Sequence, residues 1–188
     1  MWLPSLGTAA KRLQLLHELV PAVADIAFLR NPTNPYYAAL ETTELQAAAG
    51  VLGLRLLLLD ASNPGELEMA FSDIVTQQAG AFLLATDPFF MSARNQLVAL
   101  ASRHAVPAIY PFREDAVAGG MISYGTRLPD AFRLVGGYTG RIVSGNKPAD
   151  LPVQQVTKME MVINLKTARV LGVSIALPLL ARADEVIE

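Results

Sequence analysis

Short apolar runs alternate with longer amphipathic segments through most of the chain. The apolar runs have the length of single strands, and they cover residues 25–30, 54–60, 81–85, 106–110 and 121–124. Between them, apolar residues recur at spacings of three and four, which predicts helices over 8–20, 36–52, 64–76, 92–104, 114–118 and 129–144. Apolar runs separated by helices are typical of a parallel sheet that is buried on both faces.

This order of elements predicts the fold class. Repeated strand and helix units joined by right-handed crossovers wind into three layers, with helices on both faces of one sheet. We therefore expect an α/β protein, a Rossmann-like three-layer α-β-α sandwich with a mainly parallel sheet. Within the last helix of the series we expect Phe132, Val135, Ile142 and Val143 to face inward.

The pattern changes after Gly145. Residues 146–152 form a proline-containing connection, 159–164 alternate in the manner of an edge or crossover strand, and a short helix follows up to Leu171. Residues 172–188 show little periodicity. We expect this tail to be a different kind of unit, which packs on something other than the strand and helix series.

Composition excludes several classes of function. The 188 residues carry a formal net charge of −2 with the basic residues spread singly, so nothing indicates a nucleic-acid-binding surface. The chain has no Cys, which excludes disulfides, thiol catalysis and Cys-ligated metals. Its longest apolar run is far shorter than the roughly 20 residues that span a bilayer. The start, Met1 to Pro4, lacks the features of a signal peptide, so the chain is either cytosolic or a mature or truncated piece.

Known catalytic and cofactor motifs are missing where this fold would place them. The turn after the first strand, 31–35, contains two prolines instead of the glycines that bind a dinucleotide, and there is no Walker A sequence. No G-x-S-x-G elbow exists, and His17 and His104 both lie inside predicted helices. We therefore expect no catalysis, no cofactor and no metal site. Acid–base chemistry by Asp87 or Glu114 stays open as an alternative.

The strand ends instead gather groups suited to binding a small molecule. In open α/β sheets ligands bind beyond the carboxyl ends of the strands. Compact hydrogen-bonding residues, flat aromatic residues and an acidic residue occur there, and these are Asn31, Thr33, Asn34, Thr86, Asp87, Phe89, Phe90, Tyr110, Phe112, Glu114 and Tyr124. Such a mixture suits a small polar molecule with an apolar body, bound non-covalently. Helix capping by Asn31 and Asp87, and packing by Phe89 and Phe90, explain each residue singly about as well.

Several segments together resemble the family of ABC-transporter substrate-binding proteins related to tryptophan- and aromatic-amino-acid-binding components. The segments are AKRLQLLHELVP, IAFLRNPTNP, FLLATDPFF, QLVALASRHAVPAIYPFRE, AGGMISYG, YTGRIVSGNKPADLPVQQVTKMEMVINLKTARVLG and LLARADEVIE. The resemblance covers nearly the whole chain beyond Gly7 and is most specific over 147–171. It implies one lobe of a type I periplasmic binding protein, in which two Rossmann-like lobes are joined by hinge strands and hold the ligand between them.

The resemblance also implies how the chain is divided and where it binds. The chain resembles the family from the start of the second lobe, so residues 1–22 are a lead-in helix from the hinge, 23–145 a ligand-binding lobe, and 146–188 a hinge-returning C-terminal segment. The ligand residues that the resemblance implies are Asn31, Asn34, Asp87, Tyr110, Glu114 and Tyr124. The residue types at the strand ends add Thr33 and Phe89, which completes the predicted site.

We therefore expect the substrate-binding component, or a fragment of it, of an ABC importer that captures a small solute such as an amino acid in an interlobe cleft. The expected partners are that solute, an ABC permease in the parent protein, and a second copy of the chain in a homodimer through the exposed hinge face. The resemblance implies a periplasmic or extracytoplasmic location. Three alternatives stay open: the effector-binding domain of a transcriptional regulator, a flavodoxin-like enzyme fragment, and an orphan lobe that works only as a dimer or is a truncated pseudogene product.

Overall fold

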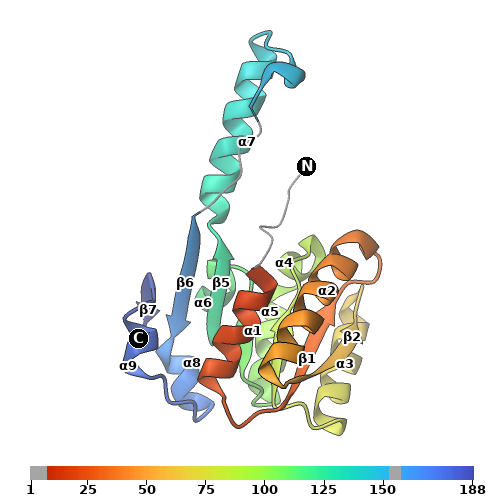
Figure 1. Ribbon diagram of the computed structural model, residues 1–188, viewed down its shortest axis with the longest axis vertical. Coiled ribbons are helices and arrows are strands. Elements are labelled where there is room, and N and C mark those ends of the chain that lie inside the picture. The colour runs from red at the N-terminus through yellow and green to blue at the C-terminus, as the bar shows by residue number, and fades with distance from the viewer. Residues whose placement is uncertain (1–7, 153–157) are drawn as a thin grey trace.

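A single sheet forms the centre of the molecule. The computed structural model describes residues 8–152 and 158–188. The rest, 1–7 and 153–157, falls within the predicted lead-in and returning segments. In the described residues the strands lie in the order β2-β1-β3-β4-β5-β6-β7 (Figure 1). Their bounds are β1 Asp25–Arg30, β2 Arg55–Asp60, β3 Ala81–Leu84, β4 Ala108–Tyr110, β5 Ile122–Thr126, β6 Met159–Asn164 and β7 Glu185–Ile187.

The strand pairing confirms the predicted fold class. β1 pairs in parallel with both β2 and β3, β3 with β4, and β4 with β5. β6 then runs antiparallel to β5, and β7 runs parallel to β6. The sheet is therefore mainly parallel, and the first five strands end at the same edge.

Helices cover the sheet and extend from it. Their bounds are α1 Thr8–Leu19, α2 Pro35–Leu52, α3 Pro64–Thr76, α4 Pro88–Ser92, α5 Arg94–Arg103, α6 Arg113–Val117, α7 Leu128–Val143, the 3₁₀ helix η1 Pro148–Asp150, α8 Leu165–Val170 and α9 Leu177–Leu180. α1 and α2 pack together in front of the sheet in Figure 1, and α3 packs with α5. The single helix predicted over 92–104 is in fact α5, preceded by the separate short helix α4.

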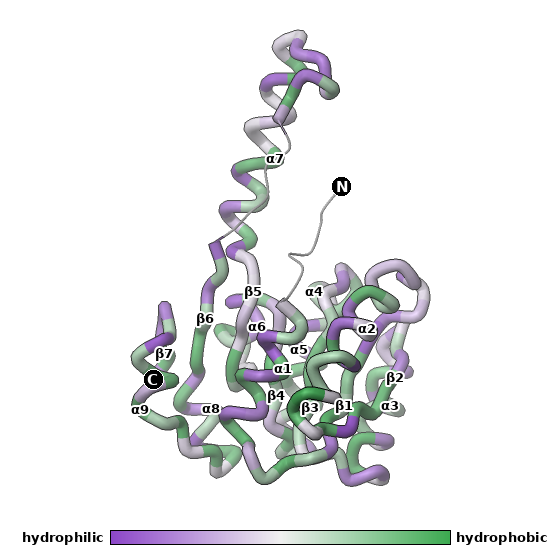
Figure 2. The backbone as a smooth tube through the Cα atoms, in the orientation of Figure 1, coloured by the Kyte–Doolittle hydropathy of each residue, from purple (hydrophilic) through white to green (hydrophobic). Residues whose placement is uncertain are grey.

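Apolar side chains of the central strands form the core. Figure 2 shows the apolar colouring of these strands inside the body of the molecule. Leu13 of α1 and Phe28 of β1 are completely buried. Phe71 of α3 meets Phe82 of β3 edge to face, with ring centroids 5.2 Å apart, and Phe82 meets Tyr110 of β4 in the same way at 5.7 Å. Such aromatic pairs add to the stabilisation from burial alone.

Local sequence signals define the helix ends. The Asn63 side chain accepts a hydrogen bond from the Glu66 amide (3.1 Å), and the Glu66 side chain accepts one from the Ser62 amide (2.7 Å). The first bond satisfies an amide that the first turn of α3 leaves without a helical partner, and the second ties the residue before the N-cap to the helix. Gly53 closes α2 with a left-handed φ of 69°, a conformation that costs Gly little.

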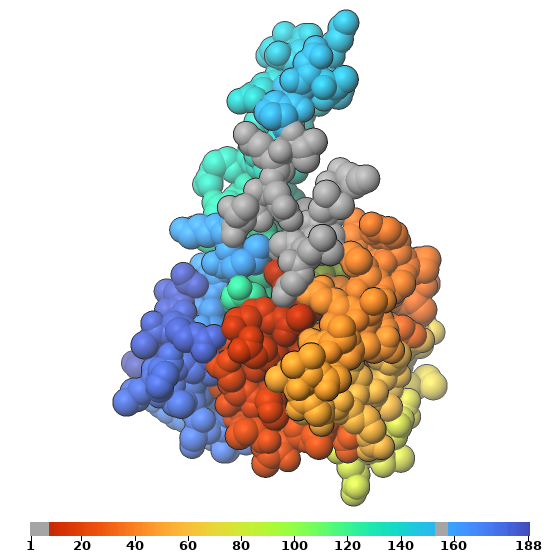
Figure 3. All heavy atoms as spheres, in the orientation of Figure 1, coloured from red at the N-terminus to blue at the C-terminus, as the bar shows by residue number. Residues whose placement is uncertain are grey.

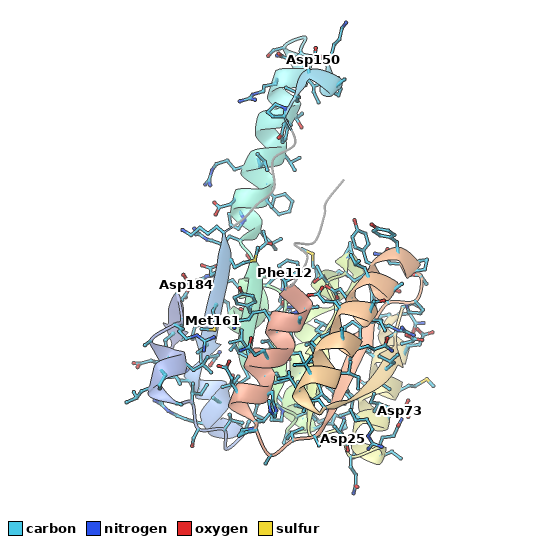
Figure 4. All side chains as sticks on the ribbon, viewed as in Figure 1. Asp25, Asp73, Phe112, Asp150, Met161 and Asp184 are labelled. Carbon is cyan, nitrogen blue, oxygen red and sulfur yellow. The ribbon has the colours of Figure 1, made fainter. Side chains whose placement is uncertain are left out.

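The expectation that the tail packs on something other than the strand and helix series is wrong. β6 and β7 extend the same sheet, and Val162 and Ile163 of β6 are completely buried. The Asp184 side chain accepts a hydrogen bond from the Met161 amide (2.8 Å), and both residues are labelled beside the sheet in Figure 4. The tail joins the sheet because β6 pairs antiparallel with β5. Alternation of apolar and polar residues predicts a strand, but it does not identify the strand beside it.

The expectation that α7 packs inward is also wrong. α7 projects from the body (Figures 1 and 3), and Asp150 lies at the far tip of the projection in Figure 4. The side chains expected to face inward are exposed: Phe132 66%, Val135 57%, Ile142 42% and Val143 82%. Periodicity identifies the apolar face of a helix, but it does not determine what covers that face.

Candidate ligand-binding site

The loops that follow β1 and β3 are joined at the carboxyl edge of the sheet by one carboxylate. Asn31 donates from Nδ2 to Oδ1 of Asp87 (2.9 Å), and Asn34 donates from Nδ2 to Oδ2 of the same residue (2.9 Å). Asp87 is 4% exposed and Asn31 7%. Hydrogen bonds to an ionised acceptor are stronger than those between neutral groups. Asp87 therefore fixes both asparagine side chains in position.

Further bonds complete this cluster. Oδ1 of Asp87 also accepts from the Phe89 amide (2.9 Å), which caps α4. Oδ1 of Asn31 accepts from the Thr33 amide (3.0 Å) and from Thr33 Oγ1 (2.7 Å). The capping role that the sequence leaves open for Asp87 is thus present. Because both Asp87 oxygens are engaged, the groups left open toward solvent are Thr33 and the half-buried Asn34.

A buried ion pair between α1 and α2 lies next to this cluster and binds the residue before Asp87. Arg12 of α1 donates from Nη2 to Oε1 of Glu41 in α2 (3.1 Å) and from Nη1 to Oγ1 of Thr86 (3.1 Å). Oε2 of Glu41 accepts from the Thr86 amide (3.0 Å). Arg12 is 1% exposed and Glu41 2%, and Nε of Arg12 has no hydrogen-bond partner within the described residues. The ion pair thus holds both the side chain and the backbone amide of Thr86, the residue directly before Asp87.

This ion pair was not predicted from the sequence, although the sequence contains a signal for it. Arg12 occupies the apolar face of its helix, between Ala9 and Leu16, both of which are completely buried. Glu41 likewise lies between the buried Ala38 and Leu45. A charged residue inside an apolar stripe needs a partner of opposite charge, because an isolated buried charge is very costly. Two such residues of opposite sign on adjacent helices therefore predict a buried pair.

The two aromatic residues after β3 differ in burial. Phe90 is 1% exposed and belongs to the core, whereas Phe89 is half-buried. Their ring centroids lie 5.3 Å apart. Phe89 therefore offers apolar surface next to the asparagine cluster, and Phe90 packs α4 against the core.

The structure does not bring Tyr110 into this cluster. Its side chain is 1% exposed and lines a small cavity of about 10 Å³ together with Val98, Gly120 and Leu171. A Cβ atom on Gly120 would lie 2.7 Å from the Tyr110 ring, so this Gly makes room for the ring. The hydroxyl has no hydrogen-bond partner within the described residues, and burial raises the pKa of Tyr110.

The other two predicted residues lie in α6, which follows β4, and in the middle of β5. Glu114 is a half-buried residue in the first turn of α6, and Tyr124 is a half-buried residue of β5 opposite Met161 of β6. Neither residue has a hydrogen bond to the Asp87 cluster within the described residues. The neighbouring Asp115 is held by Nε of Arg94 (2.7 Å) and by the Phe112 amide (3.1 Å), and burial raises the pKa of Asp115.

Ion pairs hold the junction from which α7 projects. Arg113 of α6 binds Glu185 of β7 through two hydrogen bonds of 2.7 and 2.8 Å. Arg127, which precedes α7, lies 3.5 Å from both Asp130 and Glu160. Burial raises the pKa of Glu160, against the opposing effect of Arg127. The base of α7 is thus tied to β6, while the rest of the helix is free of the body.

The larger hollows lie away from the asparagine cluster. One of about 350 Å³ runs along the polar side of α7, and one of about 510 Å³ lies between α5 and α8. The cluster itself lies on an open edge, so it forms one wall rather than an enclosed pocket. Across the described residues, no group of three His, Asp or Glu could hold a metal, and no helix is long and apolar enough to cross a membrane.

Comparison with known proteins gives a family match. Residues 5–187 match a family model described as ABC transporter substrate binding protein. No curated protein matches the chain. Three solved structures share its fold. A conserved domain protein from Vibrio cholerae is 23% identical (TM-score 0.87, covering 98% of this chain and 61% of that one). An ABC domain in complex with L-Trp from Streptococcus pneumoniae is 24% identical (TM-score 0.86, 96% and 60%).

The third is an open, ligand-free substrate-binding protein from Clostridium difficile with adhesive properties. It is 18% identical, with a TM-score of 0.68, and the match covers 94% of this chain and 59% of that one. The chain thus spans about three fifths of the length of these proteins. At such identities the likeness concerns the fold, which is that of type I periplasmic binding proteins.

Proposed function

Because the chain belongs to the family of ABC transporter substrate-binding proteins, we propose that it captures a small solute on the edge formed by the loops after β1 and β3. The solute class we propose is the amino acids. Capture is non-covalent and leaves the solute chemically unchanged. The observation that carries this proposal is the Asp87 carboxylate, which holds the side chains of Asn31 and Asn34 in fixed positions.

The chemistry of this wall suits an amino acid. The Asn34 amide keeps one N–H and its oxygen free of the Asp87 bond, so it can meet either a carboxylate or an ammonium group. The Thr33 hydroxyl donates its proton to Asn31 and can still accept a hydrogen bond, which suits an ammonium group. The half-buried Phe89 offers apolar surface for the body of the solute. The L-Trp bound by the related S. pneumoniae domain supports an amino acid as the solute class.

The alternatives receive less support. Both oxygens of Asp87 are engaged in hydrogen bonds, which argues against the flavodoxin-like enzyme that would use this carboxylate as an acid or base. The effector-binding domain of a transcriptional regulator is not favoured by the family match. We propose no cofactor and no catalytic step.

The wider role follows from the family. We propose that the solute passes to an ABC permease and that the protein acts in the periplasm or elsewhere outside the cytoplasm. The division into residues 1–22, 23–145 and 146–188 also remains a proposal. Within the described residues, α7 projects from the body and β6 lies again in the sheet.

A thermal-shift screen against the twenty amino acids tests the proposed function. A solute at a hundredfold excess over Kd stabilises the protein by about 2.7 kcal/mol and raises Tm. Asn34→Ala should abolish that shift, whereas the control Asn95→Ala, at an exposed position of α5, should retain it. A shift with no amino acid, or an equal shift in wild type and Asn34→Ala, would contradict the proposal.

A further inference from the structure

Two threonine hydroxyls lie at the carboxyl edge of the sheet, one in each of the two loops that form the proposed wall. Thr33 follows β1 and is exposed, and Thr86 follows β3 and is half-buried. The pairing of Leu29 with Leu84 aligns the two strands, and Asn31 and Thr86 each come two residues after this pair. Neighbouring strands lie about 4.8 Å apart, so Thr86 begins its loop beside the loop that carries Thr33.

The guanidinium of Arg12 determines the polarity of the Thr86 hydroxyl. Nη1 of Arg12 lies 3.1 Å from Oγ1 of Thr86, and a guanidinium can only donate. Oγ1 therefore accepts this bond, and the hydroxyl proton of Thr86 remains to donate to another group. Within the described residues the Thr86 hydroxyl has no hydrogen bond to an acceptor, because Glu41 is engaged with the backbone amide of Thr86 instead. Thr86 thus offers a hydrogen-bond donor at this edge.

Asp87 determines the opposite polarity for the Thr33 hydroxyl. An ionised carboxylate can only accept, so the group of Asn31 that faces Asp87 is its Nδ2 amide (2.9 Å). Oδ1 of Asn31 then faces Thr33 and accepts the hydroxyl proton of that residue (2.7 Å). The Thr33 oxygen keeps lone pairs with which it can accept from a further donor. Thr33 thus offers a hydrogen-bond acceptor at the same edge.

The charges behind the two hydroxyls agree with these polarities. Arg12 and Glu41 form a pair, so they balance each other. Asp87 is 4% exposed, and the groups that donate to it within the described residues are neutral amides. A buried charge is costly unless it is paired. A cationic group bound on the Asp87 side of the wall, at Thr33, is therefore stabilised by this carboxylate.

We propose that Thr86 is a binding residue of this wall that takes the carboxylate of the solute, while Thr33 takes the ammonium group, an inference that rests on the proposed function. A carboxylate needs donors, which Thr86 supplies, and an ammonium group needs acceptors, which Thr33 supplies. The two hydroxyls thus fix the orientation of the solute. Arg12 is a positioning residue, because it acts on the solute through Thr86.

This assignment narrows the class of solute. A molecule that satisfies both hydroxyls carries a carboxylate and an ammonium group close together, as a free amino acid does. An amine leaves the Thr86 donor without an acceptor, and a carboxylic acid or an N-acylated amino acid leaves Thr33 without a charged donor. A binding group left unpaired costs affinity. The wall is therefore selective for amino acids in which both charged groups are unmodified.

Binding of matched solutes tests the role of each threonine. The probes are the amino acid that raises Tm most in the screen of all twenty, the amine that lacks its carboxylate, and the acid that lacks its ammonium group. For L-Trp these are tryptamine and indolepropionate. Calorimetric titration gives the Kd of each probe for the wild type, Thr86→Val and Thr33→Val. Val replaces the hydroxyl of Thr with a methyl group of similar size.

We expect Thr86→Val to weaken binding of the amino acid about tenfold or more, because a hydrogen bond to a charged group is lost, and to leave binding of the amine unchanged. Thr33→Val should weaken binding of the amino acid and the amine and leave binding of the acid unchanged. The reverse pattern would overturn the inference. Equal weakening of the amino acid and the amine by Thr86→Val would also overturn it, because a purely structural role of Thr86 affects both probes alike.

Two further variants separate binding from folding. Thr86→Ser keeps the hydroxyl and should retain the wild-type Kd, and the control Thr43→Val, at an exposed position of α2, should bind every probe as the wild type does. Equal losses of affinity in Thr86→Ser and Thr86→Val would contradict the role of the hydroxyl.

The same titrations distinguish this inference from the proposed function. An amino acid that binds the wild type and is not weakened by Thr86→Val or Thr33→Val would refute the inference and leave the proposed function standing. Failure of all twenty amino acids to bind the wild type would refute both.

Discussion

Leu13 in α1 and Val143 in α7 both lie on the apolar face of a helix, yet Leu13 is completely buried and Val143 is 82% exposed. The body uses its apolar faces to enclose one sheet, and its charged residues Arg12 and Glu41 are buried only as a pair. α7 instead leaves its apolar face open and contains three glycines. Within the described residues the helices of the body thus bury their apolar faces in one core, whereas the apolar face of α7 stays exposed.

The largest expected effect concerns the buried ion pair of the body. Arg12→Met leaves Glu41 buried without its partner, and removal of one member of a buried pair costs about 3–5 kcal/mol. The loss should appear as a lower free energy of unfolding in urea. The double variant Arg12→Met with Glu41→Leu should recover most of it, because well-packed apolar residues can replace a buried pair.

The matched control for this prediction is the exposed pair of Arg55 and Asp25. The Arg55 side chain is 75% exposed, so Arg55→Met should leave the urea midpoint nearly unchanged. If Arg12→Met were no more destabilising than Arg55→Met, the ion pair would not support the wall as the structure indicates.

A smaller effect of opposite sign is expected in α7. Gly137 lies on the side of α7 that carries Arg133 and Arg141, and a Cβ atom added there would meet nothing within 4 Å. Gly137→Ala should therefore stabilise the helix by about 1 kcal/mol, which hydrogen exchange of the α7 amides would detect as slower exchange. Unchanged or faster exchange would mean that α7 does not form a helix in solution.

The sequence was sufficient for the parts of the fold that depend on local pattern. The five parallel strands, the cap at Asn63 and the stop at Gly53 follow from periodicity and turn chemistry, and the structure confirms them. The sequence was insufficient where the position of a segment depends on which other segment packs against it. Alternation identified β6 as a strand but not its place beside β5, and helical spacing in α7 did not reveal that Val143 is exposed.

The candidate site likewise contains residues that the sequence could group and residues that it could not. Asn31, Asn34 and Asp87 could be grouped from sequence because the ends of neighbouring parallel strands meet at one edge. Tyr110 also ends a strand at this edge, but its side chain is buried in the core. Which face of the strand a side chain occupies depends on how the strand packs against the helices, and the sequence alone does not give that packing. Arg12 was not predicted, because the pattern of one helix does not show which charged group on a neighbouring helix its side chain meets.

The most direct test of the proposed binding wall is an NMR titration of the side-chain amide resonances of Asn31 and Asn34 with each of the twenty amino acids. The Asn95 amide, on the exposed side of α5, serves as the internal reference. If the edge at Asp87 is the binding wall, one amino acid should shift the Asn31 and Asn34 resonances in a saturable manner and leave Asn95 unchanged. Saturable shifts confined to the groove between α5 and α8 would contradict the account.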